Sequence, residues 1–140
     1  MTTTDVIYGL VLAGGRSTRM HRDKAALAYH GRSQLAETFE RVSVVTNGAF
    51  VSVRADQTTD PLRRAFPQIV DRTDVGGSAL EGPLAGILAA QAAHPEAAWL
   101  IVACDLPFLD AAVLRHLVAH RDPRALATAF RSAQIGRAHV

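Results

Sequence analysis

The sequence predicts an α/β fold in which a mostly parallel β-sheet is covered by helices. Strand-like and helix-like segments alternate along the chain, which is the pattern that builds such sheets. The runs 6–12 and 99–104 are almost continuously apolar, as expected of parallel strands buried on both faces. The 140 residues, 49% of them hydrophobic, suffice for a single core, so we expect one domain.

The first half of the chain is expected to contain three strands and two helices. The run 6–12 is rich in β-branched residues and ends at glycines, whereas 35–42 has apolar residues at helical spacing. Residues 46–48 should form a turn, and Asp60 is a plausible N-cap for a short helix. The expected strands are 6–12, 50–54 and 68–71, and the expected helices are 35–42 and 61–66.

The second half is expected to begin with a flexible loop at 76–78 and to continue with two helices and two strands. The alanine-rich run after Gly82 predicts a helix that packs closely on the sheet and ends at His94. Asp110 should cap the next helix. The expected helices are 83–93 and 110–120, and the expected strands are 99–104, placed centrally, and 126–130.

Charge and cysteine content exclude several functional classes. Fifteen Lys and Arg against thirteen Asp and Glu give a net charge of +2, and the cations gather in one loop, so nucleic-acid binding is not indicated. The single cysteine excludes an internal disulfide and suits a reducing compartment. No apolar run approaches the roughly 18 residues of a membrane span. We expect a cytoplasmic protein without a membrane partner.

The segment from Leu12 to Lys24, Leu-Ala-Gly-Gly-Arg-Ser-Thr-Arg-Met-His-Arg-Asp-Lys, carries the strongest functional pattern. Gly14 and Gly15 can adopt positive φ and let backbone N–H groups approach a ligand. Cations suited to phosphates follow at Arg16, Arg19, Arg22 and Lys24. Together these features predict a loop that binds a nucleoside triphosphate. The alternative is an ordinary strand-to-helix turn with a solvated basic loop, and neither the P-loop nor the dinucleotide glycine pattern matches.

Polar residues follow the predicted strands, and ligands of parallel sheets bind beyond the carboxyl ends of their strands. Asp105 follows an apolar run, and a carboxylate at such a position is costly unless it is paired or binds a cation. Mg²⁺ prefers one or two carboxylates plus phosphate oxygens, so Asp105 is a candidate metal ligand. The alternative is a turn cap before Pro107. The residues expected at these strand ends are Gly14, Gly15, Arg54, Asp71 and Asp105.

Residues 12–24 resemble the signature L-A-G-G-x-S-x-R-M-G-x-D-K of the molybdenum cofactor guanylyltransferases and related nucleotidyltransferases. Three further blocks, at 70–71, 81–86 and 99–109, follow in the order of that family. The resemblance implies a Rossmann-like three-layer sandwich with a mostly parallel central sheet. It also implies Mg²⁺-dependent transfer of GMP from GTP to molybdopterin, with release of pyrophosphate.

The resemblance also assigns roles to individual residues. It implies that Arg19, Lys24 and Asp105 are catalytic, with Arg19 and Lys24 neutralising charge on the α-phosphate and pyrophosphate. The backbone of 12–14 and the Asp71 carboxylate would contact guanosine. Gly14 stands where cytidylyl-transferring relatives tend to carry alanine, which favours GTP over CTP. The implied nucleotide-binding residues are Leu12, Ala13, Gly14, Gly15, Lys24, Arg54, Asp71 and Asp105, and the implied metal ligand is Asp105.

Alternatives stay open at this stage. The chain could be a related nucleotidyltransferase that uses CTP or another phosphate acceptor, or a nucleotide-binding fragment without turnover. Asp71 could be a strand-end residue that hydrogen-bonds a neighbouring loop. His21 stands at the glycine of R-M-G, and a positive φ there would cost about 1 kcal/mol or more. Arg54 stands where some guanylyltransferases have asparagine.

The resemblance ends near Ala133. Residues 135–140, Ile-Gly-Arg-Ala-His-Val, equal the translation of a common sequencing adapter in one frame. We therefore expect an NTP-binding domain at 1–134, truncated at its C-terminus, and a non-native tail at 135–140.

Overall fold

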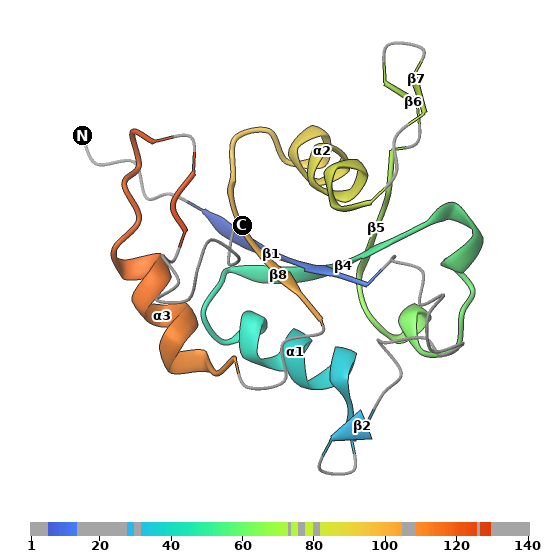
Figure 1. Cartoon of the computed structure of the whole chain (residues 1–140), viewed down its shortest axis with the longest axis horizontal. Helices are drawn as coiled ribbons and strands as arrows, with labels where there is room; N and C mark the ends of the chain where they lie inside the picture. Colours follow the sequence, from blue (N-terminus) through green and yellow to red (C-terminus); the bar gives the residue numbers. More distant parts are fainter. Residues whose placement is uncertain are drawn as a thin grey trace, which may run out of the picture.

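A four-stranded parallel sheet, in the order β5-β4-β1-β8, forms the centre of the protein (Figure 1). This computed structural model describes residues 6–13, 28–29, 32–72, 74–75, 78–79, 82–104, 109–125 and 127–129. The strands of the sheet are β1 (Ile7–Leu12), β4 (Gly48–Val53), β5 (Gln68–Val70) and β8 (Ala98–Ala103).

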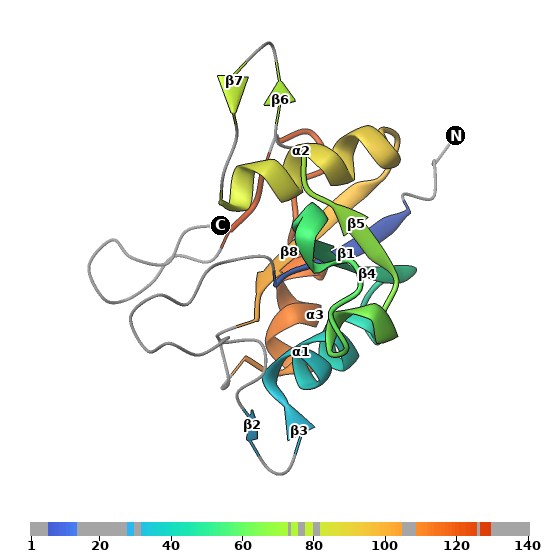
Figure 2. The same ribbon diagram turned by 90° about the vertical axis from the view of Figure 1, so that its right-hand side faces the viewer.

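Helices cover both faces of the sheet. Helix α2 (Pro83–Ala93) lies on one face, and α1 (Gln34–Ser43) and α3 (Ala111–Ala119) lie on the other, as Figures 1 and 2 both show. The predicted α/β three-layer sandwich with a parallel sheet is therefore confirmed. No helix in the described ranges is long and apolar enough to cross a bilayer.

Short elements connect these layers. Two antiparallel ladders of two residues per strand join β2 (Ala28–Tyr29) to β3 (Arg32–Ser33) and β6 (Asp74–Val75) to β7 (Ser78–Ala79). Two 3₁₀ turns, η2 (Ala55–Gln57) and η3 (Arg63–Ala65), lie between β4 and β5.

Alternation along the inner strands produces two apolar layers. In β1, Val11 is fully buried in the cluster that also holds Leu35 and Val42 of α1. Its neighbour Leu10 is fully buried in a second cluster with Ala89 and Ala90 of α2. Because successive side chains of a strand point to opposite faces, helices on both faces require a continuously apolar strand.

Two helices begin at side-chain caps. The Ser33 hydroxyl oxygen accepts a hydrogen bond from the Ala36 N–H (3.1 Å), and the Asp110 carboxylate accepts one from the Val113 N–H (2.9 Å). The expected cap at Asp110 is confirmed. Helix α2 instead follows Gly82, whose φ of 76° favours glycine, and has Pro83 in its first turn.

Two expectations about strands are wrong. Strand β8 lies at an edge of the sheet formed by the described residues, and β1 and β4 occupy the interior. Its apolar run reflects helices on both faces rather than a central position. Residues 127–129, from the strand expected at 126–130, form no strand, and the Thr128 hydroxyl oxygen accepts a hydrogen bond from the Asp122 N–H (3.2 Å). Small, exposed alanines at 127 and 129 provide little burial to support pairing.

Three further boundaries differ from expectation. The helix expected at 61–66 is only the 3₁₀ turn η3, because prolines at 61 and 67 leave too few residues for a stable helix. Ser78, the last residue of the loop expected at 76–78, is instead the first residue of β7. Strand β4 begins at Gly48, which was assigned to a turn, and ends one residue before Arg54.

Close packing of α1 on β1 at Gly9 predicts a stability effect. A Cβ at Gly9 would collide with Cγ1 of Val42 and lie 3.5 Å from the Thr46 side chain. We expect Gly9→Ala to lower the free energy of unfolding by about 1–3 kcal/mol, because the helix must shift. Urea denaturation measures this change.

Gly48→Ala is the matched control. A Cβ at Gly48 would lie 3.4 Å from Cδ1 of Tyr8, which is ordinary contact, so the change should stay within about 1 kcal/mol. Equal effects of the two substitutions would contradict this packing account.

Candidate functional site

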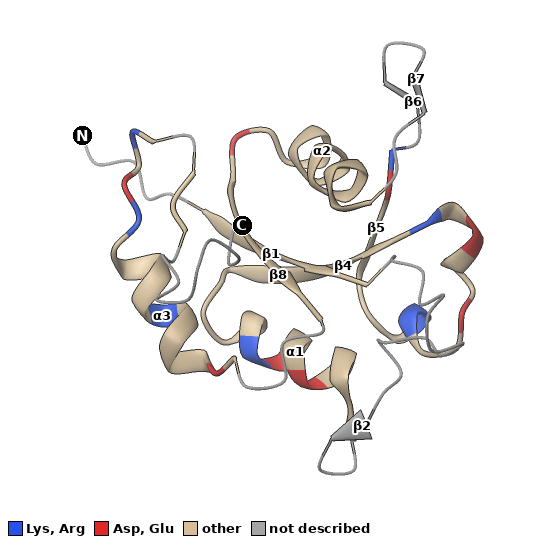
Figure 3. Ribbon diagram, in the orientation of Figure 1, with Lys and Arg blue, Asp and Glu red and all other residues tan. Residues whose placement is uncertain are grey.

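Charged residues follow the strands of the sheet at its carboxyl edge. None of the four strands contains a charged residue. Arg54 comes directly after β4 and Asp71 directly after β5, and charged positions follow these two strands in Figure 3. Because the strands are parallel, these ends meet at one edge, where ligands of such sheets bind.

Hydrogen bonds fix the strand ends relative to one another. The Ala13 N–H donates to the Ser52 carbonyl oxygen (3.3 Å), and the Asp71 N–H donates to the Val53 carbonyl oxygen (2.8 Å). The Cys104 N–H donates to the Leu12 carbonyl oxygen (3.4 Å). The chain therefore leaves β1, β4, β5 and β8 within one connected region.

The structure describes part of the expected site. Leu12, Ala13, Arg54 and Asp71 all lie at the carboxyl edge. The other expected residues lie outside the described ranges, so their roles stay predictions. They are Gly14, Gly15, Arg19, Lys24 and Asp105, together with the departure at His21.

Asp71 is part of a tight contact with β4 and α2. The hydroxyl of Ser52, which is 2% exposed, donates a short hydrogen bond to Oδ1 of Asp71. A Cβ at Gly86 of α2 would collide with the Ser52 hydroxyl and lie 3.2 Å from the same carboxylate oxygen. Gly86 thus lets α2 approach the sheet beside Asp71, which confirms the predicted close packing of this helix.

The roles of Ser52 and Gly86 were not predicted from the sequence. A glycine inside a helix costs about 1 kcal/mol relative to alanine, so its presence at position 86 was an available signal of close packing. Ser52 gave no local signal, because Asp71 is 19 residues away in the chain.

Burial raises the pKa of Asp71 above its ordinary 3.8, and the Ser52 hydrogen bond and the Arg54 charge oppose this rise. Burial outweighs both opposing effects. A carboxylate that has lost part of its hydration gains from any further hydrogen-bond donor. Asp71 is therefore well suited to accept a hydrogen bond from a ligand at this edge.

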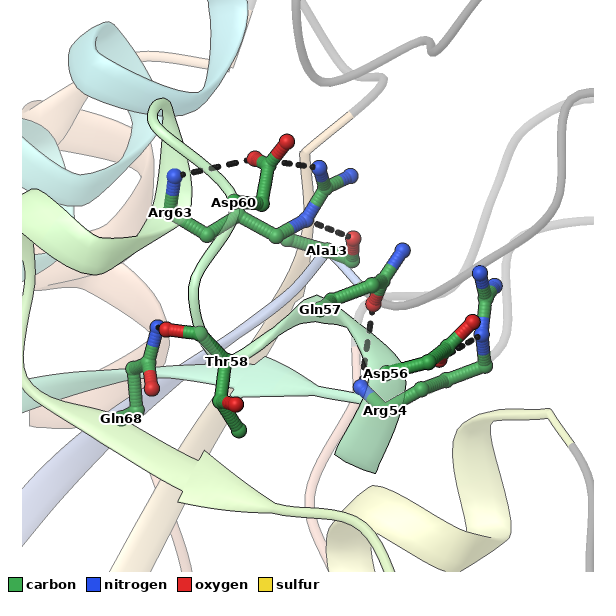
Figure 4. Close-up of polar contacts among 8 residues, drawn as sticks. All are labelled: Ala13, Arg54, Asp56, Gln57, Thr58, Asp60, Arg63 and Gln68. Carbon is green, nitrogen blue, oxygen red and sulfur yellow. Dashed lines mark hydrogen bonds and ion pairs between the residues drawn. The ribbon is translucent and has the colours of Figure 1, made fainter.

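Arg54 extends the polar edge beside Asp71. Its Nε donates to Oδ1 of Asp56 (3.0 Å), and its backbone N–H donates to Oε1 of Gln57 (3.0 Å), as Figure 4 shows. The side chain remains 28% exposed. These contacts orient Arg54 while leaving it partly accessible at the expected site.

A buried arginine, Arg63, contacts the backbone at the end of β1. Nε of Arg63 donates to the Ala13 carbonyl oxygen (2.8 Å), and its Nη1 donates to Oδ2 of Asp60 (3.0 Å; Figure 4). From the sequence, Asp60 was predicted only as a helix cap, and no role was predicted for Arg63. Their i, i+3 spacing was an available signal for an ion pair.

Within the described ranges, no group of three or more His, Cys, Asp and Glu side chains could hold a metal ion.

The raised pKa of Asp71 predicts a pH dependence of stability. Because the folded-state pKa lies above the unfolded value of 3.8, the folded state binds more protons between the two values. The free energy of unfolding of the wild type should therefore fall, relative to Asp71→Asn, as the pH rises through this interval. Urea denaturation of both proteins across pH measures the difference.

Ser52→Ala provides the control for this prediction. It removes the hydrogen bond that lowers the Asp71 pKa, so the pH interval should extend upward. If the difference in free energy of unfolding between wild type and Asp71→Asn does not vary with pH, the raised pKa of Asp71 is contradicted.

Comparisons with known proteins identify the family of the chain. Residues 9–140 match the family described as the MobA-like NTP transferase domain. The chain is 34% identical over 130 residues to a molybdenum cofactor biosynthesis bifunctional protein of Synechocystis sp., covering 93% of this chain and 36% of that protein. It is 33% identical over 116 residues to a molybdenum cofactor guanylyltransferase of Ectopseudomonas mendocina, covering 82% of this chain and 55% of that protein.

Solved structures share the fold. Rv0371c from Mycobacterium tuberculosis H37Rv superimposes with a TM-score of 0.64 at 23% identity, over 84% of this chain and 61% of that one. Molybdopterin-guanine dinucleotide biosynthesis protein A from Archaeoglobus fulgidus superimposes with a TM-score of 0.58 at 23% identity, over 79% and 53% of the two chains.

The chain thus spans only about a third to just over half of the two curated relatives compared above. The family match, in contrast, runs from residue 9, within β1, to residue 140. The chain belongs to the MobA-like NTP transferase domain family.

Proposed function

We propose that this chain is the nucleotide-binding part of an enzyme that transfers GMP from GTP to molybdopterin and releases pyrophosphate. The observation that carries the proposal is the carboxyl edge of the sheet. There Ala13, Arg54 and Asp71 lie at the ends of uncharged parallel strands. The curated relatives named molybdenum cofactor guanylyltransferase support the choice of nucleotide and acceptor.

The nucleoside would lie against Asp71. Guanine carries N–H donors on its base edge, the ribose carries hydroxyl donors, and a carboxylate accepts hydrogen bonds from either. Burial of Asp71 and its contact with Ser52 fix the position of this acceptor. Ala13 would contribute contact surface, since its N–H and carbonyl groups already have protein partners.

The phosphates would lie over the segment that follows Ala13. The residues expected there include Arg19 and Lys24, whose charges suit a triphosphate. Strands β1 and β8 are neighbours in the sheet, so the segments that follow them leave from the same edge. Asp105, the residue after Cys104, would therefore join the same site.

The donor chemistry at this edge fits Mg²⁺, which takes carboxylate and phosphate oxygens. Asp105 would hold the ion together with the triphosphate, and the ion would supply positive charge at the phosphates. In the transfer, an oxygen of the acceptor phosphate attacks the α-phosphorus of GTP, and the bond to the pyrophosphate oxygen breaks. Such a step depends on positioning and charge stabilisation, which Arg19 and Lys24 would provide.

Calorimetric titration of the chain with GTP, CTP, ATP and UTP in the presence of Mg²⁺ tests the proposal. We expect GTP to bind most tightly. Asp105→Ala and Lys24→Ala should each weaken GTP binding by about ten-fold or more, because each removes a charged contact to the metal or phosphates.

Two exposed residues away from the carboxyl edge provide matched controls. Glu96→Ala removes a carboxylate and Arg115→Ala removes a cation, and neither should change GTP affinity. Absence of nucleotide binding, or equal effects of the site and control substitutions, would refute the proposal.

A further inference from the structure

Arg63 is the largest fully buried side chain in the described part of the protein, with 1% of the residue exposed. Burying a guanidinium is costly, and an apolar residue of similar volume often serves stability as well or better. Packing alone therefore does not account for an arginine at this position. Its contacts indicate what it does instead.

Asp60 fixes the direction of the Arg63 side chain. Oδ2 of Asp60 accepts hydrogen bonds from Nη1 of Arg63 (3.0 Å) and from the Arg63 backbone N–H (3.2 Å). Because the guanidinium is a rigid planar fork, anchoring one arm orients the others. The Arg63 Nε is thereby aimed at the Ala13 carbonyl oxygen, 2.8 Å away (Figure 4).

The Ala13 carbonyl lies one residue beyond the end of β1, and Ala13 is 3% exposed. A buried carbonyl needs a hydrogen-bond donor, and Arg63 supplies it from 50 residues away in the chain. A side chain that fixes this carbonyl also fixes the direction of the backbone where the chain leaves β1.

We propose that Arg63 is a positioning residue for the nucleotide. It holds the Ala13 carbonyl and so fixes the backbone at the end of β1, against which the nucleoside would lie. The inference rests on the proposed function, in which Ala13 contributes contact surface for the nucleoside. Arg63 itself is buried and acts through the Ala13 backbone, without touching the nucleotide.

Arg63→Lys and Arg63→Met test this role, with Arg64→Lys and Arg64→Met as matched controls. Arg64 is the next residue of the same 3₁₀ turn and is exposed. Arg63→Lys keeps the charge but loses the fork, so we expect GTP affinity to fall by about ten-fold. The Arg64 variants should bind GTP as the wild type does.

A second readout separates positioning from a purely structural role. Because Ala13 lies against the nucleoside in the proposed site, Arg63→Lys should also lower the ratio of GTP to CTP affinity, which a general loss of stability would not change. The ¹³C shift of the Ala13 carbonyl should move in Arg63→Lys and stay unchanged in Arg64→Lys. Urea unfolding defines conditions in which each variant is folded during the titrations.

Asp60→Asn is the milder variant should the Arg63 variants fail to fold. The Asp60 side chain is 33% exposed, and the substitution removes its charge while leaving Arg63 in place. It should weaken GTP binding and lower the GTP to CTP ratio, by less than Arg63→Lys does.

The outcomes distinguish this inference from the proposed function. A folded Arg63→Lys that binds GTP with wild-type affinity and selectivity would overturn the role of Arg63 and leave the proposed function intact. A wild-type chain that binds no nucleotide would overturn the proposed function, and the inference with it.

Discussion

Pairing of β1 with both β4 and β8 is the constraint on which the rest of the structure depends. Leu12 is in register with Ser52 on one side and with Ala103 on the other. The register of β5 on β4 then aligns Val70 with Val53. Because all these pairings are parallel, the four strands end at the same edge of the sheet. The polar residues that follow the strands are brought together by the backbone ladder, before any side chain of the site makes a contact.

Two different sets of packing contacts support the carboxyl edge, one on each face of the sheet. On the α2 face, Gly86 lets the helix approach Ser52, whose hydroxyl fixes Asp71. On the face covered by α1 and α3, Leu62 and Phe66 pack against the apolar core on either side of η3. That packing anchors the turn that carries Arg63. The edge is therefore built from buried, rigid neighbours, which is what a preorganised binding site requires.

The burial that makes these contacts rigid has an electrostatic cost. The pKa of Asp71 is raised because the loss of hydration on burial outweighs the stabilisation of the carboxylate by Ser52 and Arg54. Arg63 is buried with a carboxylate and a carbonyl as partners. Partly desolvated polar groups at one edge of a sheet are typical of binding sites, since a ligand can supply the missing hydrogen bonds.

The sequence predicted the layers better than the contacts. Periodicity and caps predicted the strands at 6–12 and 68–71, observed as β1 and β5, together with the helix capped by Asp110 and the close packing of α2. The contact of Arg63 with Ala13 and that of Ser52 with Asp71 were missed, because they join positions 50 and 19 residues apart and leave no local pattern. Within the part of the chain that the structure describes, β8 is an edge strand and not the central strand expected, because an apolar run indicates burial on both faces and not position in the sheet.

The family resemblance added specific roles to residues that their chemistry had already indicated. The residue pattern predicted phosphate contacts for Arg19 and Lys24 and a metal contact for Asp105, and the resemblance assigned all three to catalysis. These residues lie outside the described ranges, and their roles stay predictions. For Leu12, Ala13, Arg54 and Asp71, the structure supports the expected grouping at one edge. Their contacts with a nucleotide also stay predictions.

Mapping of Mg²⁺–GTP binding on the ¹⁵N-labelled chain by NMR tests the central claim most directly. The account predicts that amide shifts concentrate at the carboxyl edge, at Ala13, Arg54 and Asp71. The aromatic cluster of Tyr8, His94 and Trp99, whose ring centroids lie 4.8–5.9 Å apart away from that edge, should stay unchanged. Shifts centred on that cluster, or no shifts at saturating Mg²⁺–GTP, would contradict it.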